Sequence, residues 1–241
     1  MSRRNLIGKL DPKFNPFDEN YLEEILQATA LAWARMEQPS SNELEDRITF
    51  RLAGRLANDA HFAELPYDIV PQYWLVGLNG ELLGRLDLRF KHRNSQRDYF
   101  AFESKRLHVT YPGGAFATEY SGYVGKKGMM AFIDGYYSKR LPACGMIGYV
   151  MDGKCDKAWR GVERRIESGR QTLRLNVKSK LEKSTLSLRV TCGMKGTQLG
   201  ETNHKLETFR LRLFHLFLPI NPKSSPAGSN AIKQDILKVF D

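Results

Sequence analysis

Two apolar segments that meet at Asn79-Gly80 constrain the fold of this chain more than any other feature. The segments cover residues 73–78 and 81–90. An Asn-Gly pair between apolar runs is a strong signal for a β-hairpin, because both residues tolerate the positive φ of a type I′ turn. The pattern therefore predicts two antiparallel strands joined at this turn.

A third strand of the same meander is predicted over residues 99–105, after a polar loop at 91–98. Side chains alternate between the two faces of a strand, so Glu103 and Lys105 share one face. The opposite face carries Phe100, Phe102 and Ser104. An isolated carboxylate–ammonium pair contributes little to stability when it is solvated, so this pair alone does not define a site.

Asp87 changes the interpretation of the Glu103–Lys105 pair, because the meander places the second strand, which carries Asp87, beside the third. Two acids on adjacent strands destabilise a sheet unless a cation neutralises them. Mg²⁺ prefers such carboxylate oxygens and retains several of its own waters. The expectation is a divalent cation held between Asp87 and Glu103.

The spacing of these residues resembles the PD-(D/E)xK nuclease superfamily, also called restriction-endonuclease-like. Asp87 is followed by fifteen residues and then by Glu103-Ser104-Lys105, although Leu86 stands where the family name has proline. The resemblance implies that Asp87, Glu103 and the backbone carbonyl of Ser104 hold Mg²⁺, with Mn²⁺ able to substitute. It also implies that Lys105 positions or activates the attacking water.

The order of predicted elements agrees with this resemblance. Helical spacing and apolar runs predict, in order, a helix at 42–59, the three strands, a helix at 123–137, a strand at 144–151 and a helix at 157–168. The family's αβββαβ core has this order, so the expected fold class is α/β (α+β) with a mixed central sheet.

Three regions are expected along the chain. An arm and a helix occupy residues 1–41, the nuclease-like core occupies 42–169, and a β-rich extension packed on the core occupies 170–241. Alternation predicts strands at 172–178 and 185–191 within that extension.

Glu45 is a further candidate for the site. In the 42–59 helix, Leu44, Ile48, Leu52 and Leu56 form an apolar stripe, and Glu45 falls within its sector. Ser41 or Asn42 is the expected cap. In the family, a Glu on this helix often reaches the metal or its waters, and Glu45 matches it. An equally weighted alternative is a first-turn acid that stabilises the helix dipole.

The charge balance favours a polyanionic partner. The chain has 37 Lys and Arg against 27 Asp and Glu, a net charge of +10. Nucleic acid is the first candidate and an anionic membrane surface the second. Lys126 and Lys127 open the predicted 123–137 helix, where the family often has basic residues, and are candidate phosphate contacts.

A second basic cluster covers residues 154–183, where ten Lys and Arg stand against four Asp and Glu, a local +6. We expect it to contact nucleic-acid backbone, with Arg160 and Arg164 as its representatives. The alternative is that these side chains only protect an exposed sheet edge.

Other function classes receive no support from the sequence. The longest apolar run, near 213–220, is too short for a membrane span, and the N-terminus does not resemble a signal peptide. Three separated cysteines without a CxxC pair indicate a reducing, cytoplasmic compartment and disfavour zinc.

The resulting expectation is a magnesium-dependent endodeoxyribonuclease, of the kind that serves in restriction or phage defence. RNA stays open as a substrate, as does action as a homodimer or as the subunit of a larger complex. The alternatives are a nucleic-acid-binding subunit or a scaffold that retains the fold without the catalysis.

Overall fold

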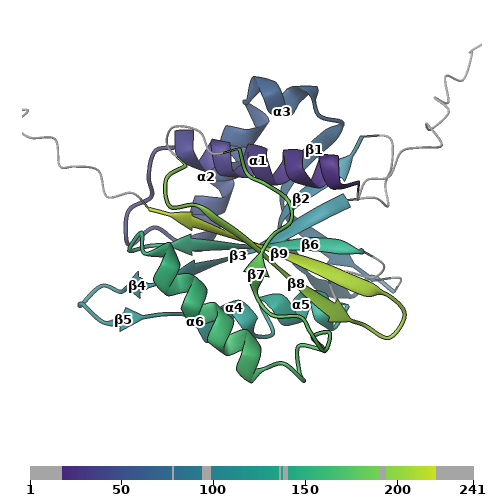
Figure 1. Ribbon diagram of the computed structural model, residues 1–241. Helices are drawn as coiled ribbons and strands as arrows, with labels where there is room; N and C mark the ends of the chain where they lie inside the picture. Colours follow the sequence, from purple (N-terminus) through teal and green to yellow (C-terminus); the bar gives the residue numbers. More distant parts are fainter. Residues whose placement is uncertain are drawn as a thin grey trace, which may run out of the picture.

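A computed structural model describes residues 18–77, 79–93, 99–135, 137, 141–189 and 194–220. The predicted N-terminal arm lies outside these residues up to position 17. Figure 1 shows one central sheet with helices on both of its faces.

Seven strands form a mixed sheet in the order β1-β2-β3-β6-β9-β8-β7. The middle strands β3, β6 and β9 run parallel, and all other neighbours are antiparallel. The strands are β1 (Tyr67–Val76), β2 (Leu82–His92), β3 (Tyr99–Leu107), β6 (Ala143–Val150), β7 (Glu182–Lys183), β8 (Gln198–Lys205) and β9 (Arg210–Pro219). A separate pair consists of β4 (Val109–Thr110) and β5 (Phe116–Ala117). The predicted α+β class with a mixed central sheet is confirmed.

Helices cover the sheet in two layers. On one face lie α1 (Glu19–Arg35) and α2 (Glu45–Ala57), with the short α3 (Ala60–Glu64) after them (Figure 1). On the other face lie α4 (Tyr120–Val124), α5 (Met129–Ile133) and α6 (Cys155–Ser168). No helix among the described residues is long and apolar enough to cross a membrane.

The predicted 42–59 helix is α2, with a later start. Ile48, Leu52 and Leu56 are buried as the stripe requires, whereas Leu44 is 67% exposed. The predicted cap at Ser41 or Asn42 is wrong, because Leu44 occupies the N-cap position without a side-chain hydrogen bond. The helix therefore begins with Glu45 in its first turn.

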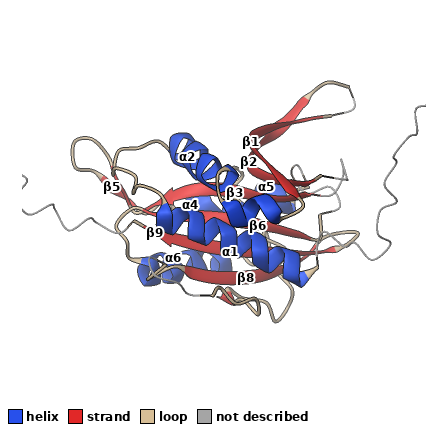
Figure 2. Cartoon of the chain, turned by 90° about the horizontal axis from the view of Figure 1, so that it is seen from above, coloured by secondary structure: helices blue, strands red, loops and turns tan. Residues whose placement is uncertain are grey.

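The β1–β2 hairpin is confirmed, but its turn is wider than predicted. The Gly77 N–H donates to the Glu81 carbonyl at 2.8 Å, so the turn spans Gly77 to Glu81 rather than two residues. Gly80 has a φ of +83°, which glycine adopts without cost. Figure 2 shows the hairpin projecting beyond the sheet.

The single helix predicted at 123–137 is wrong. Two short helices, α4 and α5, replace it, with the chain broken between Gly125 and Gly128. A Cβ at Gly128 would lie 2.1 Å from the Tyr123 carbonyl oxygen, so the backbone there turns too tightly for any side chain.

The C-terminal region extends the central sheet itself, since β9 pairs in parallel with β6 and β8 pairs with β9. The predicted strand at 172–178 is wrong, and the described part of 185–191 is likewise not a strand. Arg170 supplies a reason, because its guanidinium donates to the carbonyls of Asn176, Val177 and Ser179. These carbonyls are satisfied in a turn and need no strand partner.

Candidate active site

A fork between β2 and β3 positions the site. The two strands pair only from Leu88–Phe102 to Lys91–Tyr99, and beyond Leu88 they diverge. The Asp87 side chain fills the gap, since its Oδ2 accepts hydrogen bonds from the Ser104 N–H at 2.8 Å and the Ser104 hydroxyl at 2.7 Å. A buried carboxylate thus takes the place of the missing ladder bond.

The alternation predicted for β3 is confirmed. Ser104 faces α2, where its Oγ lies 3.0 Å from Thr49 Oγ1, which in turn lies 3.1 Å from the Tyr149 hydroxyl. Glu103 and Lys105 instead face a hollow of about 440 Å³. That hollow is lined by Glu45, Asp46, Trp74, Arg85, Asp87, Glu103, Lys105, Lys127 and Tyr137. Four predicted catalytic residues therefore share one hollow.

The Lys105 ammonium lies at the centre of this group. Its Nζ donates to Glu103 Oε1 at 2.8 Å, to Glu45 Oε1 at 3.1 Å and to the Ser104 carbonyl at 2.6 Å. The carbonyl expected to bind Mg²⁺ is thus hydrogen bonded to lysine in this structure.

Burial and like charge control the electrostatics of the acids. Burial, followed by the Asp87 carboxylate, raises the pKa of Glu103 to about 8. Burial also raises the pKa of Glu45. Burial lowers the pKa of Lys105, but Glu103, Glu45 and Asp87 outweigh it and the net shift is upward. Lys105 therefore stays protonated, whereas burial opposes the ionisation of Glu103 and Glu45.

Glu45 reaches across from α2 to β3. Its Oε1 accepts from Lys105, and its Oε2 accepts from the Arg106 N–H at 2.8 Å. Both alternatives drawn from the sequence are compatible with this placement, because Glu45 also occupies the first turn of α2.

Of the four acidic residues that line the hollow, Asp87 and Glu103 are the candidate ligands. Within the described residues, no group of three or more His, Cys, Asp or Glu side chains is arranged to hold a metal ion. Glu103 Oε2 is nevertheless buried without a hydrogen-bond partner in that part of the chain. A buried acceptor of this kind is costly unless a donor or a cation completes it.

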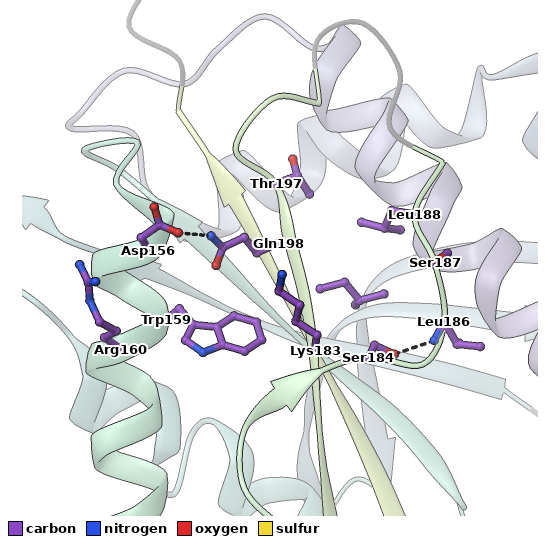
Figure 3. Close-up of a pocket in the computed structure, with 11 residues that line it drawn as sticks. Asp156, Trp159, Arg160, Lys183, Ser184, Leu186, Ser187, Leu188, Thr197 and Gln198 are labelled. Atoms are coloured by element: carbon purple, nitrogen blue, oxygen red, sulfur yellow. Dashed lines mark hydrogen bonds between the residues drawn. The ribbon is translucent and has the colours of Figure 1, made fainter.

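The basic residues predicted to contact nucleic acid lie in two separate places. Lys127 lines the hollow, whereas Lys126 does not. Arg160 lies on α6 and lines a second hollow of about 600 Å³ beside β7 and β8, with Trp159 and Lys183 (Figure 3). Arg164 donates to the Arg160 carbonyl at 3.2 Å. The α6 arginines therefore do not line the hollow around Asp87.

Comparisons with protein-family models, curated proteins and solved structures found no match.

Several residues that line the hollow around Asp87 were not predicted from the sequence. Trp74 and Arg85 are cross-strand partners in the hairpin, and the guanidinium lies 5.6 Å from the indole centroid. Arg85 also pairs with Asp46 at 2.9 Å. A two-residue turn at Asn79-Gly80 also places Trp74 opposite Arg85, so the predicted hairpin could have revealed this pairing. Gln72, which contacts Asp87, gave no signal.

Proposed function

We propose that this protein is a metal-dependent endodeoxyribonuclease of the PD-(D/E)xK group. The observation that carries the proposal is the fork at Leu88–Phe102, which directs Asp87 and Glu103 into one hollow with Lys105 beside them. The helix-before-hairpin order, and the parallel strand β6 beside β3, support the same assignment.

The residues of the hollow fit a divalent cation. Asp87 and Glu103 supply two carboxylates, and Glu103 Oε2 is buried without a partner among the described residues. Two carboxylates with several waters are a usual environment for Mg²⁺. Mn²⁺, which takes the same oxygen ligands, is expected to substitute. When bound, the ion would lower the pKa of a water and neutralise charge on the phosphate.

The chain's own residues supply the remaining chemistry. Lys105 keeps its proton because the neighbouring acids raise its pKa, so it is suited to stabilise negative charge that develops on the phosphate. Glu45 holds Lys105 in place through its Oε1. The Ser104 carbonyl becomes available to a cation only if the ammonium moves from its present position.

DNA is the proposed substrate. The net charge of +10 favours a polyanion, and Lys127 and Arg85 place cationic groups on the wall of the hollow. Phosphate contacts of this type give affinity without sequence preference. A role in restriction or phage defence is proposed on the family resemblance alone.

Cleavage of supercoiled plasmid tests the proposal. The wild-type protein should nick or linearise plasmid with Mg²⁺ and lose this activity with chelator. Asp87→Asn and Lys105→Met should be inactive with far-ultraviolet circular dichroism spectra like that of the wild type. Retained cutting by either purified variant would refute the assignment.

A catalytically inactive nucleic-acid-binding subunit is the second candidate. It is favoured by the position of Lys105, whose ammonium already neutralises the acids without a metal. Thermal denaturation separates the two candidates. Millimolar Mg²⁺ stabilises a protein with a metal site, because binding to the native state alone shifts the unfolding equilibrium. No shift in melting temperature, together with salt-sensitive DNA binding, would favour the inactive subunit.

A further inference from the structure

Gln72 has a backbone conformation that its residue type disfavours. It lies within β1 with a φ of +52°, in the left-handed region that glycine occupies freely and glutamine does not. The register does not shift across Gln72, since Pro71 lies opposite Leu88 and Tyr73 lies opposite Leu86. Gln72 and Asp87 therefore face one another at a local interruption of the ladder.

The Gln72 side chain contacts the metal-binding candidate directly. Its Nε2 donates to Asp87 Oδ1 at 3.3 Å, whereas Asp87 Oδ2 accepts both hydrogen bonds from Ser104. The Gln72 contact thus acts on the carboxylate oxygen that Ser104 leaves available to an ion.

The other end of the same amide is unsatisfied. Gln72 Oε1 is buried and has no hydrogen-bond partner within the described part of the chain. A buried acceptor without a donor is unfavourable, and so is the positive φ. If the position served only to bend the hairpin, glycine would bend it without either cost. The side chain therefore needs a role beyond the bend, one that includes the contact with Asp87 and supplies a donor to the amide oxygen.

We infer that Gln72 is a positioning residue of the metal site. Its amide N–H holds Asp87 Oδ1, and its amide oxygen is the acceptor for a water molecule that hydrates the bound cation. Mg²⁺ retains such waters, and outer contacts of this type tune metal affinity. The inference rests on the proposed function only in requiring that a cation binds at Asp87.

Titration calorimetry with MgCl₂ tests this role, together with thermal denaturation in chelator. Gln72→Gly removes the amide and relieves the backbone, so it should weaken Mg²⁺ binding at least tenfold while the metal-free melting temperature is unchanged or higher. Arg174→Gly is the matched control, because Arg174 also has a positive φ, of +49°, but its side chain pairs with Asp134 and not with Asp87. It should leave Mg²⁺ affinity unchanged.

Gln72→Glu separates the two ends of the amide. The variant keeps an oxygen acceptor but loses the donor and places a second charge beside Asp87. Its Mg²⁺ affinity should stay within a few-fold of wild type, and its metal-free melting temperature should fall.

The outcomes distinguish this inference from the function on which it rests. If the wild type binds no Mg²⁺, the proposed function fails. If the wild type binds and Gln72→Gly binds equally well, only the role of Gln72 is overturned. Equal loss of affinity in the Gly and Glu variants would overturn the acceptor role of the amide oxygen.

Discussion

Glu45 shows how one side chain can join two elements of a site. It begins α2, yet its carboxylate oxygens accept from Lys105 and from the backbone of Arg106 in β3. These contacts fix the lysine relative to the helix. Asp46, the next acid in the same first turn, instead pairs with Arg85.

Glu45→Gln should therefore lower the rate of DNA cleavage about 10- to 100-fold, the range found when a supporting contact is lost. Its effect on the free energy of unfolding should be no more than about 1 kcal/mol, since a charge at a helix N-terminus contributes little more. Cleavage rates and urea denaturation measure the two effects. If Glu45→Gln and Asp46→Asn lowered stability equally and neither changed the rate, Glu45 would act only on the helix dipole.

At the scale of elements, burial distinguishes leucines that the sequence pattern treats alike. Leu44 and Leu52 both belong to the predicted stripe, but Leu52 is fully buried and Leu44 is 67% exposed. Leu52→Ala should lower the free energy of unfolding by roughly 2–5 kcal/mol, because it leaves a cavity under α2. Leu44→Ala should change it by no more than about 0.5 kcal/mol. Equal effects in urea denaturation would contradict the observed start of α2.

The break between α4 and α5 makes a second prediction at this scale. Ala at Gly128 would place its Cβ 2.1 Å from the Tyr123 carbonyl oxygen, so we expect a loss of at least about 1 kcal/mol of stability. At Gly122 the nearest atom is a Glu119 carboxylate oxygen at 3.6 Å. Gly122→Ala should be neutral or slightly stabilising, since alanine favours helix. Equal urea midpoints for the two variants would argue for a continuous helix.

For the whole molecule, two buried histidines connect the sheet to α4 and to Leu173, which follows α6. Thr202 Oγ1 lies 2.8 Å from His204 Nε2 and 2.9 Å from His215 Nε2, and Tyr123 OH lies 3.1 Å from His215 Nδ1. Burial lowers the pKa of His204 to about 4 and that of His215 to about 3. Both are therefore neutral in the native protein at pH 5.

Buried His204 and His215 should each destabilise the native state as the pH is lowered from about 6.5 towards 4, whereas Glu103, whose pKa is raised, acts in the opposite direction. Histidines of the unfolded chain bind protons in this window while the buried ones do not, so each contributes a slope of roughly 1.4 kcal/mol per pH unit. Urea denaturation between pH 7.5 and 4.5 measures the slope. His204→Asn should reduce it, whereas His61→Gln, at an exposed histidine, should not. Equal slopes for the wild type and His204→Asn would contradict the assignment of His204 as neutral.

Local patterns predicted most of the elements, because their periodicity depends on nearby residues. The alternation in β3 and the meander predicted that Asp87, Glu103 and Lys105 lie together, whereas Glu45 was predicted from its position on the 42–59 helix and from the family resemblance. The features that the sequence did not predict depend on contacts between residues far apart in the chain. Arg170 satisfies carbonyls where a strand was expected, and α6 carries Arg160 to a different hollow from Lys127. The positive φ of Gln72 could not be predicted, because glutamine does not favour this backbone conformation.

Calorimetric titration of Mg²⁺ into the wild type and Asp87→Asn tests most directly whether the fork between β2 and β3 holds a metal ion. Asp68→Asn is the control, since Asp68 is also an acid of the hairpin but pairs with Arg93 outside the hollow. We expect saturable binding to the wild type and the control, and none to Asp87→Asn. Equal binding to all three proteins would contradict the account.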